Sequence, residues 1–251
     1  MNEIDGFWWL LISAGLLIVL QHNLHKEIQG VFLLLTRRAD VSIVLFSILF
    51  FPGIFVHEAS HFLAARMLRV PTGGFSLIPR QTVKEKLQLG YVETAHADIV
   101  RDALIGAAPL LTGGLIVAYI GLKQFNLPAL WEAIQAGAIG SWREALTMIY
   151  HSADFWIWLY LAFVVSSTMM PSKSDRRAWI PIAFTLLVML ALSLLAGAGP
   201  WLMLHMAPIL NSILKSIAFI FGISVVIHFI FWLPFLSSRM ILERIMGLRV
   251  E

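Results

Sequence analysis

The sequence predicts an all-α polytopic membrane protein with about six transmembrane helices and a small cytoplasmic β-hairpin or sheet after the second helix. Hydrophobic residues make up 59% of the 251 residues, charged residues only 13%, and the mean hydropathy is +0.82. Soluble domains carry about 25% charged residues. Runs long enough and apolar enough to span a bilayer cover residues 6–22, 41–65, 103–122, 153–171, 178–197 and 216–236. Soluble-core helices would not supply so many such runs in one short chain.

The first two predicted spans each need a separate justification. Residues 6–22 follow an acidic flank that contains Glu3 and Asp5, whereas a secretory signal begins with basic residues. We therefore expect a retained helix. The second span contains Pro52 and Gly53, which predict a kink or a loosened hydrogen-bond ladder. Two further apolar stretches are short for a span and are left open as re-entrant or interfacial helices, namely residues 28–36 and 199–214.

Residues 66–102 form the one substantial polar segment of the chain. Val70 to Gly74 contains a proline and two glycines, which end the preceding helix. Residues 75–78 and 86–94 have strand-like composition, and we expect them to form the small hairpin or sheet. Asp98 then stands at the start of the third span, where its side chain can cap a helix.

The distribution of basic residues predicts the orientation. With six crossings, twelve of the 18 lysines and arginines lie on the side of the two termini and of the segments 66–102 and 173–177. The positive-inside rule then places both termini in the cytoplasm. The basic residues are scattered, which favours contact with the lipid bilayer over a nucleic-acid surface. We expect a multi-pass protein of a bacterial or archaeal plasma membrane, of undetermined oligomeric state.

The most informative motif lies inside the second span. His57-Glu58-Ala59-Ser60-His61 is an HExxH sequence, which places two imidazoles one helical turn apart on one face, where both can bind the same zinc ion. Ionisable groups at membrane depth are costly and therefore suggest function. A pair of surface histidines on an ordinary helix is the alternative, but the apolar neighbours leave the motif no obvious contact with water.

A catalytic zinc site usually takes three protein ligands, so a third must come from elsewhere. Asp175 is favoured because it lies in a very short, proline-interrupted link between two predicted spans, on the side toward which the HExxH helix runs. A loop ion pair with Arg176 or Arg177 would also explain it. The other candidates near span ends are Glu93, His96, Asp98, His151, Asp154, His205 and His228.

Three segments of the chain resemble the site-2 protease family of intramembrane metalloproteases. Residues 55–61 are similar to the zinc helix of that family. Residues 101–112 are similar to its basic residue followed by Gly-Pro-x-x-Asn, and residues 168–175 to its Asn-x-x-Pro…Leu-Asp-Gly element. Thr112 and Thr168 stand where the family carries asparagine. The resemblance implies a minimal, divergent member without a PDZ domain, and it makes Asp175 the third zinc ligand.

The resemblance also implies a domain organisation and a reaction. Residues 1–251 would form a single membrane domain with a metalloprotease-like core at 41–180 and accessory helices at 1–40 and 181–251. Zinc would be the cofactor, bound by His57, His61 and Asp175, and Glu58 would be the general base for hydrolysis of a membrane-protein or peptide substrate. Thr112 or Thr168 would donate to the oxyanion.

Two other functions remain open at this point. Residues 101–112 and 168–175 differ from the family elements that they resemble. Such differences are also expected of a zinc-binding membrane scaffold or adaptor without proteolytic activity. Intramembrane His, Glu and Asp residues also occur in small ion- or proton-coupled transporters. The sequence contains no internal repeat of the kind that many transporters have, which makes the transporter the weaker alternative.

Overall fold

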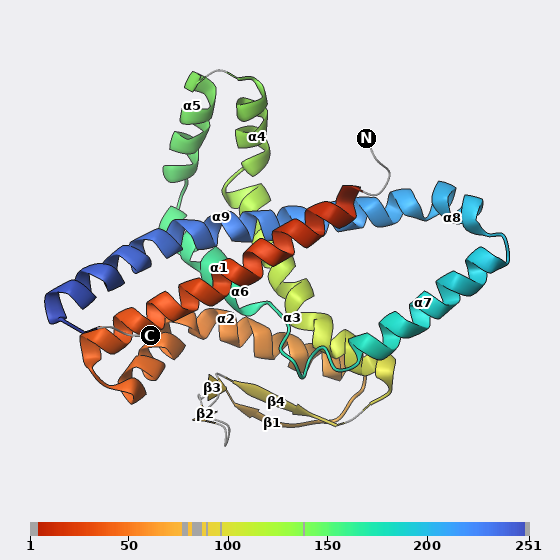
Figure 1. The fold of residues 1–251 in the computed structure, drawn as a ribbon, viewed down its shortest axis with the longest axis horizontal. Coiled ribbons are helices and arrows are strands. Elements are labelled where there is room, and N and C mark those ends of the chain that lie inside the picture. The colour runs from red at the N-terminus through yellow and green to blue at the C-terminus, as the bar shows by residue number, and fades with distance from the viewer. Residues whose placement is uncertain are drawn as a thin grey trace.

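The computed structural model describes residues 5–76, 80–81, 87–88, 90–95, 97–137 and 139–248. Helices dominate this part of the chain (Figure 1). Their bounds are α1 Asp5–Thr36, α2 Ala39–Met67, α3 Ile99–Tyr119 with a π-helical continuation η1 Ile120–Gln124, α4 Leu127–Gln135, α5 Ile139–Tyr150, α6 Phe155–Thr168, α7 Trp179–Leu195, α8 Gly199–His205 and α9 Ala207–Met246. The prediction of a mainly helical protein is confirmed.

Four of the described helices are long and apolar enough to cross a membrane: α1, α2, α3 with its continuation η1, and α9. The count rises to six if two bent helix pairs each form one span. Residues 140–150 of α5 meet α6 at 89°, and α7 meets α8 at 117°. The short apolar stretch 28–36 proves to be the end of the continuous helix α1, whereas 199–214 is divided between α8 and α9. Pro52 lies inside α2, which continues through it.

Short strands occupy the polar segment between α2 and α3. β1 (Thr72–Ser76) pairs antiparallel with β4 (Tyr91–Thr94), and β2 (Arg80–Gln81) pairs with β3 (Leu87–Gln88). The register of the first pair is irregular between Thr72 and Phe75. Predicted strand residues 77–78, 86 and 89 lie outside the described residues. As predicted, Asp98 caps α3: its side chain accepts hydrogen bonds from the N–H groups of Val100 and Arg101.

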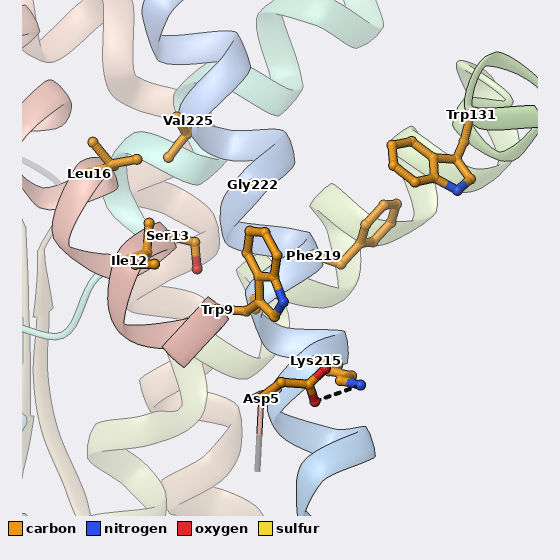
Figure 2. A pocket seen from close by; sticks show the side chains of 11 residues that line it. Asp5, Trp9, Ile12, Ser13, Leu16, Trp131, Lys215, Phe219, Gly222 and Val225 are labelled. Carbon is orange, nitrogen blue, oxygen red and sulfur yellow. Dashed lines mark ion pairs between the residues drawn. The ribbon is translucent and has the colours of Figure 1, made fainter. Parts of the chain in front are cut away.

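Polar contacts fix the relative directions of the helices. α1 and α9 run parallel, because Asp5 contacts Lys215 at 2.7 Å near one end (Figure 2) and Glu27 contacts Arg239 at 3.2 Å near the other. The Asp5–Lys215 pair lies beside a cavity of about 590 Å³ between these two helices. α2 and α6 also run parallel, since the Tyr160 hydroxyl donates to the carbonyl of Leu49 and, further along both helices, His57 Nδ1 contacts the carbonyl of Thr168.

One apolar cluster joins α1, α2, α3, α6 and α9. Its fully buried members include Leu24, Phe50, Val117 and Phe163. The helices that the sequence marked as accessory therefore share their core with the segment that carries the HExxH motif. In contrast, α7 has no buried residue.

Candidate metal centre

The two histidines of the HExxH motif meet an aspartate from a distant loop. The Nε2 atoms of His57 and His61 lie 3.2 Å apart on one face of α2. Asp175 lies in the link between α6 and α7, and its carboxylate oxygens approach His57 Nε2 at 3.8 Å and His61 Nε2 at 3.5 Å. One ligand atom from each residue falls within 4.8 Å of the others. Within the described part of the chain, this is the one group of three such side chains that could hold a metal ion.

Backbone carbonyls orient both imidazoles. His57 Nδ1 lies 2.7 Å from the carbonyl oxygen of Thr168, and His61 Nδ1 lies 2.8 Å from that of Ile105. A carbonyl oxygen can only accept, so each Nδ1 carries a proton, and in the neutral imidazole Nε2 keeps its lone pair. Such outer partners fix the tautomer and the ring orientation of metal-binding histidines.

The donor set fits a divalent cation such as zinc. Two imidazole lone pairs and a carboxylate oxygen converge on one point, where they would repel one another without a positive charge between them. Two nitrogens and one oxygen from protein also match catalytic zinc sites, which leave a fourth position open. The chemistry of the residues is therefore that of a site for a divalent metal ion.

Glycines allow the elements of the site to approach closely. A Cβ on Gly53, one turn before His57, would collide with the backbone oxygen of Val164 in α6 and would lie 2.6 Å from Thr168 Oγ1. A Cβ on Gly106 of α3 would collide with the backbone oxygen of Asp175. Only glycine therefore fits where α2 meets α6 and where α3 meets the loop of Asp175.

A tight turn presents the Asp175 carboxylate to the histidines. The N–H of Ser172 donates to Asp175 Oδ2 at 2.7 Å, and the N–H of Asp175 donates to Ser172 Oγ at 3.3 Å. Burial raises the pKa of Asp175, but the contact with His61 and the hydrogen bond from Ser172 outweigh it and bring the pKa down to about 2. Arg177 contacts Asp102, 3.4 Å away, from the same loop.

Glu58 lies beside the histidines, buried with 9% of its surface exposed. The backbone of Gly90, just before β4, covers it so closely that a Cβ there would lie 2.9 Å from Glu58 Cγ. Next to the site is a cavity of about 330 Å³ with polar walls that include His61, Asp175 and Ser174. The cavity has space for water beside His61.

The two threonines predicted as oxyanion donors, Thr112 and Thr168, lie in different surroundings from each other. The hydroxyl of Thr168 donates to the carbonyls of Val164 and Val165 in its own helix, while its carbonyl holds His57. Thr112 lines a different cavity, of about 520 Å³, between α2 and α3, together with Ala59 and Ser60. At about 100° of rotation per residue, Ala59 faces away from His57 and His61, and Ser60 points to one side of them.

The other third-ligand candidates take other roles or positions. His205 contacts the carbonyl of Trp201, His228 bonds Ser224 and Ser167, and Asp98 caps α3. His151 and Asp154 lie at the turn between α5 and α6. The Glu93 side chain and His96 lie outside what the structure describes.

Comparison of the chain with protein-family models, with curated proteins and with solved structures found no match. Support for a function therefore comes from the geometry of the site and from the resemblance of the three sequence segments.

Proposed function

We propose that this protein is an intramembrane zinc metalloprotease that hydrolyses a peptide bond in or near a transmembrane segment of a membrane protein. The observation that carries the proposal is the convergence of His57, His61 and Asp175 beside the buried carboxyl group of Glu58. When bound, zinc lowers the pKa of a water ligand to about 7 and polarises a carbonyl group.

The protein side chains have separate tasks in this mechanism. His57 and His61 bind through Nε2, since their Nδ1 atoms donate to the carbonyls of Thr168 and Ile105. Asp175 adds the negative charge. Glu58 takes the proton from the attacking water on a carboxylate oxygen and then gives it to the nitrogen of the leaving amine as the C–N bond breaks.

A substrate must present an extended segment to this site. A helix shields its own peptide bonds, so the segment has to unwind before cleavage. The β1–β4 ribbon follows α2 directly, and Val92 of β4 lines the cavity beside His61 and Asp175. Edge pairing with this ribbon would hold an unwound segment in the orientation needed.

The test uses the purified full-length protein in proteoliposomes with fluorescence-quenched transmembrane peptides. We expect about one zinc per chain, cleavage by the wild type, and no cleavage by Glu58→Gln with zinc retained. Glu132→Gln, on the exposed surface of α4, is the matched control and should cleave normally. Turnover by Glu58→Gln would contradict the assigned role. Zinc binding without cleavage of any peptide by the wild type would indicate the scaffold function instead.

The helix directions also bear on the topology in the membrane. α2 returns antiparallel to α1, since the Ser42 hydroxyl donates to the Gln29 carbonyl across the turn that joins them. α6 runs parallel to α2, so its end at Thr168 lies on the side where α1 begins. α9 runs parallel to α1 and begins on that side too. The bent pair α7–α8 would then start and finish on one side.

We infer five crossings, with α7–α8 as a re-entrant or interfacial pair and the two termini on opposite sides. The sequence-based prediction that both termini are cytoplasmic assumes six crossings. Five crossings would place the termini on opposite sides of the membrane. Arg239, Arg244 and Arg249 would move to the other side, and Lys215, which contacts Asp5, would join the side of the N-terminus. The 18 basic residues would then divide ten to eight, which removes most of the charge bias.

The absence of cysteine from the sequence makes this topology simple to test. Single substitutions Asn2→Cys, Lys173→Cys and Glu251→Cys would be labelled with a membrane-impermeant maleimide in intact cells and in inverted vesicles. We expect positions 2 and 173 to be labelled from one side and position 251 from the other. Labelling of all three from the same side would restore six crossings.

A further inference from the structure

The carbonyl group that orients His57 belongs to the last turn of α6. The final four carbonyls of a helix have no partner within the helix and need one from elsewhere. Here the carbonyl of Thr168, the last residue of α6, accepts from His57. The position of this helix end therefore determines the position of the imidazole.

The neighbouring residue, Ser167, ties this helix end to two other helices. Gln21 of α1 donates its side-chain N–H to the carbonyl of Ser167, another of the unpaired carbonyls. The hydroxyl of Ser167 lies 3.0 Å from Nε2 of His228 in α9. His228 Nδ1 lies 2.7 Å from the carbonyl of Ser224, so Nδ1 carries the proton and the Ser167 hydroxyl must donate to Nε2.

The hydrogen bond between Ser167 and His228 lies in a dry environment. Ser167 is 2% exposed and His228 is 0% exposed. A buried polar group that loses its partner costs about 1–3 kcal/mol, so these bonds hold their geometry firmly. Neither Gln21 nor His228 belongs to the segment that resembles a protease, and neither contacts the metal-binding atoms directly in the bonds described.

We propose that Gln21 and His228 are positioning residues of the metal centre, acting through Ser167 on the Thr168 carbonyl and thus on His57. This rests on the proposed function, since it assumes that the three-residue site binds zinc. It gives α1 and α9 a role in metal affinity, in addition to their share of the apolar core.

The experiment measures zinc affinity of the purified full-length protein by competition with a chromophoric chelator. Ser167→Ala removes the bond to His228, and Gln21→Leu removes the other tether at similar volume. We expect each to weaken zinc binding about threefold to tenfold, less than the roughly 10–100-fold cost of losing a direct outer partner. The matched control is Ser166→Ala, because the Ser166 hydroxyl, at 0% exposure, bonds the carbonyl of Phe163 in its own helix.

A pair of variants at position 228 separates positioning from mere support of the fold. His228→Gln keeps an acceptor for the Ser167 hydroxyl and should retain most of the zinc affinity, whereas His228→Leu should lose it to the same extent as Ser167→Ala. Thermal unfolding of the metal-free proteins shows whether a variant is only less stable.

Two results would overturn the inference. Equal zinc affinity of the wild type, Ser167→Ala and Gln21→Leu refutes the positioning role while the metal site stands. Equal weakening by Ser167→Ala and Ser166→Ala refutes it as well, because the control lacks the tether. A wild type that binds no zinc refutes the metal centre itself, and with it the proposed function.

Discussion

Replacing Gly53 with alanine tests how strictly the metal centre depends on the contact between α2 and α6. The added Cβ would collide with the carbonyl oxygen of Val164 and would lie 2.6 Å from Thr168 Oγ1. Real Cβ atoms essentially never come closer than 3.0 Å to another heavy atom. The carbonyl of Val164 is backbone and cannot rotate away, so the two helices must separate by roughly 1 Å, in line with the backbone shifts that overpacking causes.

The separation has two measurable consequences. Overpacking of this kind destabilises a fold by about 1–3 kcal/mol. The bond from His57 Nδ1 to the Thr168 carbonyl, now 2.7 Å, would lengthen by a similar amount and pass out of hydrogen-bond range. Loss of such an outer partner typically weakens metal binding about 10–100-fold, which corresponds to roughly 1.4–2.7 kcal/mol.

The assay is zinc affinity by chelator competition, with thermal unfolding of the metal-free protein measured alongside. Gly222→Ala in α9 and Gly15→Ala in α1 are matched controls, because a Cβ at either position has nothing within 4 Å. Both should bind zinc with wild-type affinity. Wild-type affinity in Gly53→Ala would refute the reasoning, since it would mean that the helices can separate without loss of the His57 orientation.

Three other substitutions probe separate parts of the site. Gly106→Ala forces the Asp175 backbone away from α3 and should weaken zinc binding about tenfold or more by the same competition assay; an unchanged affinity would show that the loop adapts freely. Asp175→Asn keeps the side-chain volume but removes the charge, and one zinc per chain at low zinc concentration would contradict its role as ligand. Gly90→Ala brings a Cβ within 2.9 Å of Glu58 Cγ, so turnover should fall by roughly the 10²–10⁴-fold that a general base supplies, with zinc content unchanged. Normal turnover in this variant would mean that Glu58 tolerates displacement.

The candidate metal ligands on α2 can be predicted from the sequence because their signal is local. The spacing of His57 and His61 on a helix places both rings on one face, whatever the rest of the fold does. Asp175 was suggested by its place in a short link whose side of the membrane followed from the order of the spans. The structure brings the three side chains together.

The groups that hold the histidines in place could not be predicted from the sequence. The partners of the two Nδ1 atoms are backbone carbonyls, those of Ile105 and Thr168, and every residue type offers such a group. Gly53 and Gly106 were visible as glycines, yet their importance depends on which atoms face them across a helix contact. Thr168 was selected for its hydroxyl, whereas its carbonyl makes the contact with His57.

The number of membrane crossings also could not be predicted from the sequence, for a physical reason. Apolar length identifies a segment that prefers lipid, but it does not say whether that segment crosses the bilayer or turns back within it. Residues 178–197 are as apolar as any other run, and α7 still meets α8 at an angle of 117°. The direction of α9 relative to α1, which decides between five and six crossings, comes from two ion pairs more than 200 residues apart in sequence.

The loop of Asp175 shows how a departure from a family pattern can leave a site geometrically intact. Compared with the site-2 protease element that it resembles, this chain has one residue fewer between proline and aspartate, and arginine follows the aspartate. Residue counting alone would therefore point the carboxylate elsewhere. The turn closed by Ser172 brings it back over the end of α6, because the Ser172 N–H holds Oδ2 while Oδ1 faces His61. Gly106 then admits the loop backbone against α3. The hydrogen bonds of the turn and Gly106 therefore determine where the Asp175 carboxylate lies, and the length of the link does not.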